Sequence, residues 1–254
     1  MKILLLNDDG IEAEGLKSLE NELINSGHNI FTVAPLHEKS ASSHSITLRD
    51  PLRVVDKGEN RFAVTGNPAD CAILALEVLV GKDVDLVISG VNRGQNMGED
   101  ILYSGTVGAA MEAAGFGIPS IAVSITSYVD PIFSTATKFV NTLIKQNVLS
   151  HIPQNGILNI NVPNITYSKL KGIKVTTTGN RRYHDFVTEQ QDHRNNTIFW
   201  IGGRKAVWTE IKNSDASAIS EGYVSITPVR PIFTNERLIS DFSDWLHESG
   251  LRIK

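Results

Sequence analysis

Residues 2–35, KILLLNDDGIEAEGLKSLENELINSGHNIFTVAP, carry the pattern that decides the fold of this chain. The run Lys2–Leu6 is short and apolar, which is typical of a buried parallel strand. Apolar residues then recur at helical spacing at Leu16, Leu19, Leu23 and Ile24. Gly27 stands where a C-terminal cap of that helix belongs, and residues 29–34 form a second strand-like run that ends at Pro35. The stretch therefore predicts a strand–helix–strand unit with a right-handed crossover.

The same alternation continues to about residue 147 and predicts a mostly parallel sheet. Further strand-like runs occupy residues 46–48, 52–55, 61–65, 84–89 and 118–124. Helices are expected between them, one capped by Asn67, one over residues 104–115 and one opened by Asp130. Such alternation is typical of a doubly wound, Rossmann-like α/β fold.

After residue 147 the pattern becomes β-rich. Strand-like runs occupy Ile157–Val162 and residues 172–178, 197–201 and 222–227, with hairpin arms expected at 172–178 and 197–201. A final helix is expected over residues 235–248. We therefore expect a single domain, residues 1–254, in which residues 1–147 form the α/β core carrying the site. Residues 148–254 are expected to form a β-rich extension with β-hairpins and a C-terminal helix, suited to subunit contacts.

The composition excludes several classes of protein. The chain has 254 residues, of which 41% are hydrophobic and 20% charged, and its formal net charge is −4. This apolar content is too high for intrinsic disorder, and the acidic balance excludes duplex nucleic acid as the main partner. Glu77, Glu112 and Pro119 interrupt the most apolar stretches, and polar residues follow Leu6, so neither a membrane span nor a signal peptide is expected. Cys71 is the only cysteine and is expected in the packed core, which predicts a cytoplasmic protein without disulfides.

Three polar segments follow predicted strands, at the edge of the sheet where α/β folds bind ligands. The first is Asn7-Asp8-Asp9-Gly10, directly after the first strand. Two adjacent carboxylates repel each other, and burying them beside a sheet is costly unless a cation or hydrogen-bond donors compensate. The alternative is a simple turn in which Asp9 caps the following helix and Gly10 takes a positive φ.

The second segment is the serine-rich loop of residues 36–45. Its part Lys39-Ser40-Ala41-Ser42-Ser43-His44-Ser45 has the composition of an ordinary solvated loop. One of its hydroxyls can add a neutral oxygen ligand near the two aspartates, but spacing does not select which one. His44 is expected to be a hydrogen-bonded support rather than a catalytic residue.

The third segment, residues 89–98, reads SGVNRGQNMG and is followed by Tyr103-Ser104-Gly105-Thr106. The glycines let the backbone approach a ligand closely, and residues 104–106 place free N–H groups at a helix N-terminus, which is a ready anion site. A capped helix after a loop would show the same short motif. The glycines, amides and arginine immediately upstream favour phosphate binding.

Together these segments offer carboxylate, hydroxyl and carboxamide oxygens, with no sulfur and no clustered imidazole. Such a donor set suits a hard cation, Mg²⁺ or Mn²⁺, rather than structural Zn²⁺. A hard cation beside a helix N-terminus can activate water and clamp a phosphoryl group. The residues alone therefore predict metal-dependent phosphoester hydrolysis.

With these motifs in hand, the chain resembles the SurE family, the stationary-phase survival proteins that act as metal-dependent 5′/3′-nucleotidases. The resemblance is carried by Asn7-Asp8-Asp9-Gly10-Ile11, Val33-Ala34-Pro35, Ser40-Ala41, His44-Ser45-Ile46-Thr47, Gly66-Asn67-Pro68-Ala69-Asp70-Cys71, Ser89-Gly90-Val91-Asn92-Arg93-Gly94 with Asn96 and Gly98, Tyr103-Ser104-Gly105-Thr106-Val107 and Gly222-Tyr223-Val224-Ser225-Ile226-Thr227-Pro228. These motifs occur in the family's order over nearly the whole chain and are most specific in its first half. Lys39 stands where the family often has Arg, and Asn67 where Thr is frequent, which bears on fine substrate preference rather than on the reaction.

The resemblance implies a complete site. One divalent cation per subunit, Mg²⁺ or Mn²⁺, is held by Asp8, Asp9, Ser40 and Asn92. The phosphate pocket is lined by Asn96, Ser104, Gly105 and Thr106. The implied substrates are nucleoside 5′- and 3′-monophosphates, with short polyphosphate as a further candidate. In the mechanism that we expect, one acidic residue, Asp8 or Asp9, also takes a proton, and the sequence does not select which. The implied assembly is a homodimer or homotetramer that exchanges C-terminal elements.

Two other functions stay open from the residues. A phosphatase with an aspartyl-phosphate intermediate would use Asp8 as nucleophile, although enzymes of that type resemble one another in an Asp-x-Asp pattern and here the two acids are adjacent. A nucleotide-binding sensor without turnover would bind AMP or GMP tightly and release no phosphate. Arg181 and Arg182, in the polar stretch 178–196, are expected at a solvated hairpin tip, the alternative being that they reach a long polyanion.

Overall fold

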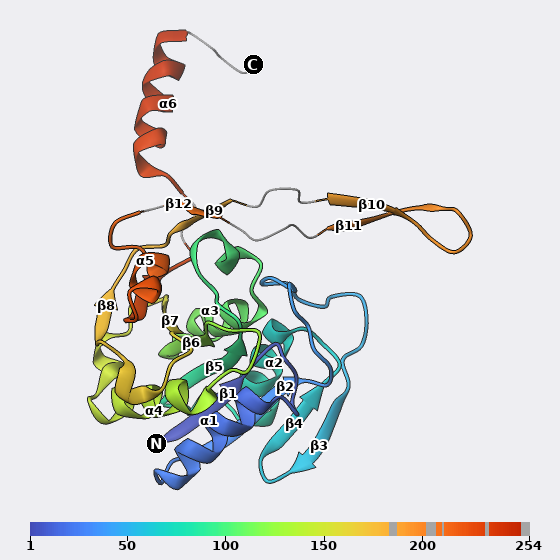
Figure 1. The fold of residues 1–254 in the computed structure, drawn as a ribbon, viewed down its shortest axis with the longest axis vertical. Coiled ribbons are helices and arrows are strands. Elements are labelled where there is room, and N and C mark those ends of the chain that lie inside the picture. The colour runs from blue at the N-terminus through green and yellow to red at the C-terminus, as the bar shows by residue number, and fades with distance from the viewer. Residues whose placement is uncertain (183–186, 202–206, 210, 232–233, 250–254) are drawn as a thin grey trace.

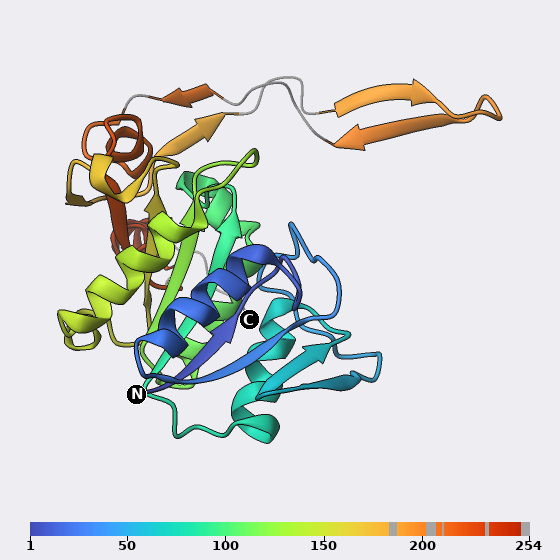
Figure 2. The same cartoon turned by 60° about the horizontal axis from the view of Figure 1, so that its bottom comes forward.

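The structure is a computed structural model, and it describes residues 1–182, 187–201, 207–209, 211–231 and 234–249. Its main body is a nine-stranded sheet with helices on both faces. A two-stranded hairpin extends away from this body (Figures 1 and 2), and so does the last helix (Figure 1). The predicted fold class, a mostly parallel α/β sheet with β-hairpin extensions, is confirmed.

The first elements form the predicted strand–helix–strand unit. They are β1 (Lys2–Leu6), α1 (Glu14–Asn25) and β2 (Asn29–Pro35), and β1 pairs with β2 in parallel. Gly27 follows the end of α1 with a φ of +82°, which a glycine adopts without steric cost. Ile24 shares the helical spacing but is exposed, because it lies beside the stripe of leucines that α1 buries.

The strand order is β3-β4-β2-β1-β5-β6-β7-β13-β8. The bounds of the other strands are β3 (Val54–Gly58), β4 (Arg61–Val64), β5 (Leu86–Arg93), β6 (Ser120–Ile125), β7 (Ile157–Val162), β8 (Ile173–Val175) and β13 (Val224–Val229). The strands from β4 to β7 run parallel, while β3 and β13 pair antiparallel with β4 and β7. From β1 the chain builds the sheet first toward β2 and then, through β5, toward the other edge. The crevice of this fold therefore lies outside the carboxyl ends of β1 and β5.

Several predicted strands are absent from the structure or have other bounds in it. Residues 46–48 form no strand; Thr47 donates its N–H to Asp70 Oδ1 at 2.8 Å and its hydroxyl to Asp70 Oδ2 at 2.7 Å, so a side chain satisfies this backbone instead of a neighbouring strand. The next strand, β3, begins at Val54 rather than at residue 52. β5 continues to Arg93, well beyond its predicted end at residue 89, and so brings the glycine-containing segment into the sheet.

The C-terminal half contributes strands to the main sheet. Residues 172–178 are not a hairpin arm: they contain β8, which pairs in parallel with β13 at the edge of the sheet. Hairpin arms and edge strands have the same alternating composition, so only the tertiary pairing separates them. Thr197–Ile201 (β11) is a hairpin arm as predicted, and its partner is β10 (Val187–Gln191). The sheet thus continues past residue 147, through β7, β13 and β8.

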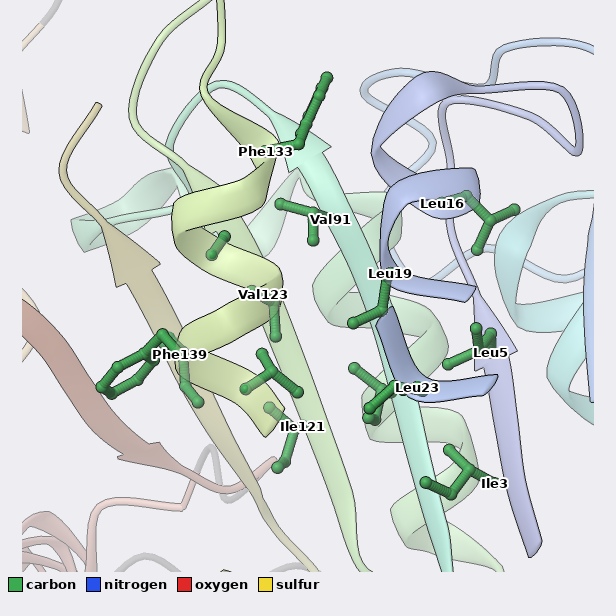
Figure 3. Packing of buried hydrophobic residues seen from close by; sticks show 14 of the residues in the cluster. Ile3, Leu5, Leu16, Leu19, Leu23, Val91, Ile121, Val123, Phe133 and Phe139 are labelled. Carbon is green, nitrogen blue, oxygen red and sulfur yellow. The ribbon is translucent and has the colours of Figure 1, made fainter. Parts of the chain in front are cut away.

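Helices cover both faces of the sheet. α1 and α4 (Phe133–Lys145) lie on one face, and α2 (Pro68–Leu74) and α3 (Gly105–Gly115) lie on the other. Successive side chains of a strand point to opposite faces. Alternate residues of β1 accordingly join α1 and α4 in one core cluster (Figure 3), and the residues between them join α2 and α3 in a second.

The helix starts agree with the sequence in two of three cases. Asn67 caps α2 in a capping box with Asp70, and the helix continues as the π-helical turn η1 (Ala75–Leu79). Ser104 caps α3. α4 begins at Phe133 rather than at Asp130, because Asp130 has a φ of +46°, which a right-handed helix does not accept. Cys71 is a buried free thiol in the core, as expected.

The remaining elements form the extension and short turns. β9 (Asn180–Arg182) pairs with β12 (Val207–Thr209), and the hairpin of β10 and β11 reaches away from the sheet (Figure 2). The helices are α5 (Asp215–Ser220) and α6 (Glu236–Ser249), and the 3₁₀ turns are η2 (Gly98–Leu102), η3 (Val148–His151) and η4 (Tyr167–Lys169). Within the described parts of the chain, no helix has the length and apolar character needed to cross a lipid bilayer.

Candidate active site

The predicted site residues meet in the crevice outside β1 and β5. A cavity of about 770 Å³ opens there, and five of the eight predicted residues line it: Asp8, Ser40, Asn92, Asn96 and Ser104. Asp9 lines a neighbouring cavity of about 290 Å³, which shares Ser40 with the larger one. Gly105 and Thr106 lie behind the floor, against Asp8. Segments that are up to 98 residues apart in the sequence are thus assembled at one place.

Asp8 is a buried carboxylate at the end of β1. The pKa of Asp8 is raised from 3.8 to about 6, mainly by burial; the hydrogen bonds from Thr106 oppose this rise, and the neighbouring charge of Asp9 adds to it. The hydroxyl of Thr106, which is itself fully buried, donates to Asp8 Oδ1. Thr106 therefore contacts Asp8 directly and does not line the cavity.

Asp9 carries the second carboxylate. Burial raises its pKa, the Arg93 backbone N–H lowers it by donating to Asp9 Oδ2 at 3.1 Å, and the charge of Glu38 raises it. Two adjacent acids whose pKa values are both raised form a site of excess negative potential. A positive charge placed between them would relieve this cost.

Ser40 and Asn92 present oxygen atoms rather than donors to this site. The Ser40 hydroxyl donates to Glu38 Oε1 at 2.6 Å, which leaves the lone pairs of Ser40 Oγ for a ligand. The Asn92 amide nitrogen donates to the Gly94 carbonyl at 2.8 Å, so the amide oxygen is the atom left for the cavity. The loop that carries Ser40 is fixed to β1 because Lys39 donates its N–H to the Asp8 carbonyl at 2.8 Å.

These residues fit a hard divalent cation. Two carboxylates, one hydroxyl and one amide oxygen are the donors that Mg²⁺ and Mn²⁺ prefer. In the described part of the chain there is no group of three or more His, Cys, Asp or Glu residues that could hold a metal ion. A cation at this site would therefore depend on the neutral oxygens of Ser40 and Asn92 as well as on the two aspartates.

Asn96 is held by a network that the sequence analysis missed. Its backbone N–H donates to Asn161 Oδ1 at 2.9 Å, and its carbonyl accepts from Asn159 Nδ2 and Asn161 Nδ2, both at 2.8 Å. The Asn96 side-chain amide donates to Ser124 Oγ at 2.9 Å. The available signal was the two asparagines in the otherwise apolar strand ILNINV, since buried polar groups need partners.

Ser104 stands at the cavity wall and caps α3. Its hydroxyl oxygen accepts from the Val107 N–H at 3.1 Å, and the residue is buried. Because the serine oxygen acts as the acceptor in this bond, its hydroxyl proton stays available to an anion in the cavity. The helix N-terminus adds its partial positive charge at the same point.

The extension also contributes to the cavity. Arg181 was expected at a solvated tip, but its side chain is largely buried, forms an ion pair with Asp100 and lines the cavity. Its position follows from β9, whose backbone is tied to Glu99 by the Arg181 N–H at 3.1 Å. The side chain of Arg182 lies outside the described part of the chain.

A buried carboxylate joins the extension to the cavity rim. Asp215 accepts from the N–H groups of Gly98 at 2.8 Å, Gly179 at 2.8 Å and Ala216 at 2.7 Å. Burial raises its pKa and these three donors lower it. Asp215 therefore links the start of α5 and the β8–β9 connection to η2, and local sequence gave no signal for this role.

The serine-rich loop has a second anchor. His44 Nε2 lies 2.7 Å from Glu112 Oε2 of α3, so His44 is a hydrogen-bonded support, as expected. The Ser43 N–H also donates to the Tyr103 carbonyl at 2.9 Å. These contacts fix the loop against the start of α3.

The raised pKa of Asp8 predicts a pH dependence of stability. Its folded-state pKa of about 6 lies above the ordinary value of 3.8, so the folded chain binds this proton more tightly than the unfolded chain. Without a divalent cation, Asp8 is expected to lower the free energy of unfolding by about 3 kcal/mol as pH rises from about 4 to above about 6. Asp8→Asn should remove this fall. Urea unfolding of both proteins with chelator across this pH range measures it, and equal slopes for the two proteins would contradict the expectation.

Comparisons with known proteins agree with this fold. A family model described as survival protein SurE matches residues 3–185. The 5′-nucleotidase SurE of Gemmatimonas aurantiaca is 41% identical over 98% of this chain and 100% of its own length. The 5′-nucleotidase SurE of Petrotoga mobilis is 42% identical over 97% of this chain and 99% of its own. The crystal structure of the SurE protein from Aquifex aeolicus has a TM-score of 0.85 and 37% identity, covering 96% of this chain and 99% of that one.

Proposed function

The chain belongs to the SurE family of survival proteins and is a 5′-nucleotidase, and we propose that it hydrolyses nucleoside monophosphates with one divalent cation per subunit. Asp8, Asp9, Ser40 and Asn92 would hold this cation. The observation that carries the proposal is the pair of adjacent, buried carboxylates whose pKa values are both raised. Beside them lie the Ser40 hydroxyl oxygen, whose proton is donated to Glu38, and the Asn92 amide oxygen. Such a site favours a hard cation over an empty state.

The side chains around the cation site have different roles in the reaction. When bound, a divalent cation would supply Lewis-acid chemistry, lowering the pKa of a water and withdrawing charge from a phosphoryl oxygen. Asn96 and Ser104 bind the phosphate with amide and hydroxyl donors, helped by the N-terminus of α3. Asp8 or Asp9 accepts the proton of the attacking water. The hydrogen bonds that Asn159 and Asn161 donate to the Asn96 carbonyl keep Asn96 in place while charge develops on the phosphate.

The proposal extends to 3′-monophosphates and short polyphosphate as further substrates. The contacts described for the phosphate do not depend on which ribose oxygen carries it. We also place the protein in the cytoplasm, since its one cysteine, Cys71, is a buried free thiol and a reducing compartment suits it.

Phosphate release tests this function directly. With Mg²⁺ or Mn²⁺, the protein is expected to release phosphate from 5′- and 3′-nucleoside monophosphates, and excess chelator should abolish the release because the carboxylates then lack their counter-charge. A panel of monophosphates and a short polyphosphate, each with and without chelator, measures it by free phosphate. Tight nucleotide binding without phosphate release at any metal concentration would instead identify a sensor. Phosphate trapped on Asp8 would identify an aspartyl-phosphate mechanism.

We further propose that the extension makes a homodimer or homotetramer. The hairpin exposes Phe199 and Trp200, and α6 exposes Phe242 and Trp245, whose ring centroids lie 5.0 Å apart. Exposed aromatic residues on elements that project from the body are typical of interfaces. A second copy of this chain is the partner that the family resemblance implies.

The assembly is expected to depend on α6. Light scattering should find a dimer or tetramer for the unchanged protein and a smaller species for the double variant Phe242→Ser, Trp245→Ser, because that change removes the two exposed aromatic side chains of α6. Val78→Ser is the matched control, since Val78 is exposed on the body. A monomer in the unchanged protein, or an unchanged mass in the double variant, would contradict the proposed assembly.

A further inference from the structure

The cavity has two chemically different parts. Its floor consists of buried polar groups, Asp8, Asn92 and Asn96 among them. Its wall includes two aromatic side chains, Tyr103 and Tyr128, which are 63% and 61% exposed. The whole cavity of about 770 Å³ lies within the size range of sites for complete small molecules, so a phosphate on the floor leaves room beside the tyrosines.

Tyr128 is held in place by a glycine. A Cβ added to Gly94 would lie 2.2 Å from Tyr128 Cε1 and 2.4 Å from Cζ, so the ring lies directly against the Gly94 backbone. Gly94 is fixed in turn, because its N–H donates to the Ile125 carbonyl at 3.0 Å. Tyr128 lines both cavities of the site; burial raises the pKa of its hydroxyl, and the charge of Arg181 lowers it. Tyr128 thus offers an anchored aromatic surface beside the floor.

Tyr103 is held by its backbone. Its N–H donates to the Asp100 carbonyl at 3.0 Å, and its own carbonyl accepts from the Ser43 N–H at 2.9 Å. It directly precedes Ser104, the cap of α3 on the cavity wall. Tyr103 leads into α3 and Tyr128 leads into α4, and these helices lie on opposite faces of the sheet. Both side chains nevertheless line the same cavity.

The charged side chains of the wall lie close to opposite charges. Arg181 and Asp100, which also line it, are paired with each other. Arg93 acts on Asp9, whose pKa it lowers both by its charge and by its backbone N–H. Beyond the floor the cavity therefore presents aromatic faces, a neutralised ion pair and Arg93 near Asp9, and the aromatic faces suit a planar, uncharged group.

We propose that Tyr103 and Tyr128 bind the nucleoside part of the substrate, with the nucleobase stacked on their rings. This rests on the proposed function and adds the part of the substrate beyond the phosphate. Stacking on an aromatic face is open to every base, since every base has a π-face. The subsite selects nucleotides over phosphate esters that lack a base, and it does not read the identity of the base.

The test compares AMP with ribose 5-phosphate, which has the same ester but no base. In Tyr103→Ala and in Tyr128→Ala, the ratio of kcat/KM for AMP to that for ribose 5-phosphate is expected to fall about 5- to 150-fold, mainly through KM for AMP. Tyr103→Phe and Tyr128→Phe should keep the ratio within about twofold, because stacking needs the ring and not the hydroxyl. Tyr167→Ala is the matched control, since Tyr167 lies in η4 and contacts Thr142 of α4.

Adenosine binding gives a readout that does not need turnover. Calorimetry should show weaker adenosine binding to both alanine variants than to the control. A ratio and an adenosine affinity within about twofold of the unchanged protein, for either alanine variant, would overturn the proposal. So would equal losses for AMP and ribose 5-phosphate, which indicate a structural role. Failure of the proposed function is distinct: the unchanged protein would then release no phosphate from AMP, whatever its tyrosines bind.

Discussion

Asp9→Asn is expected to lower the rate of phosphate release from AMP by at least about a hundredfold at saturating substrate. The substitution keeps the size of the side chain and an oxygen that can accept from the Arg93 N–H, but it removes one negative charge from the cation site. The cation concentration for half-maximal activity should therefore rise as well. Steady-state rates over a range of Mn²⁺ concentrations measure both effects.

The fold should tolerate this change. Burial raises the pKa of the Asp9 carboxylate, so its charge is unfavourable in the cation-free protein and a neutral amide removes that cost. Asp83→Asn is the matched control, because Asp83 is exposed and lies just before β5, at the end of the strand opposite the site. If activity survives both chelation and Asp9→Asn, the metal mechanism is wrong.

Gly105→Ala is expected to lower activity about a hundredfold and the free energy of unfolding by about 1–3 kcal/mol. A Cβ at this position would lie 2.6 Å from Ser42 Oγ, 2.8 Å from Asp8 Cβ and 2.9 Å from Pro68 Cγ. Asp8 Cβ and Pro68 Cγ lie close to the backbone and cannot turn aside, so α3 and Asp8 must move apart. The bonds between Thr106 and Asp8 would then no longer hold the carboxylate beside Asn92.

Gly115→Ala in the same helix is the matched control. A Cβ there meets nothing within 4 Å, and alanine costs less conformational entropy than glycine in a helix. Its free energy of unfolding should stay equal or rise slightly, with unchanged activity. Urea unfolding and phosphate release of both variants check the pair. A Gly105→Ala protein as stable and as active as the Gly115→Ala protein would refute this account of the α3 terminus.

Local pattern was sufficient for the elements that carry the site. The apolar run of β1, the leucine spacing of α1 and the cap at Ser104 depend on neighbours only a few residues away, and all three are confirmed. The cation and phosphate residues were placed by family resemblance, since spacing alone did not select Ser40 from its loop. The structure gathers them around one crevice, while their chemical roles remain predictions.

Local pattern was insufficient wherever a contact spans the sheet. Residues 172–178 have the composition of a hairpin arm, yet they contain an edge strand, because the free edge of β13 was available to them. Arg181 lies in a polar stretch that is typical of a solvated tip, yet β9 turns it toward Asp100. For Asn161 the local pattern shows only an amide side chain in an apolar strand, without its partner. In each case the partner is set by strand order and not by neighbours in the chain.

The sequence by itself determined the alternating α/β architecture, the acidic pair after the first strand and the capped helix that follows the glycine segment. Tertiary structure alone decided which groups hold these residues in position. Thr106 reaches Asp8 across 98 residues, Asn161 reaches Asn96 across 65 and Asp215 reaches Gly98 across 117. The physical reason is that strand periodicity and helix caps are short-range properties, whereas the partners of buried polar groups depend on which strands become neighbours in the sheet.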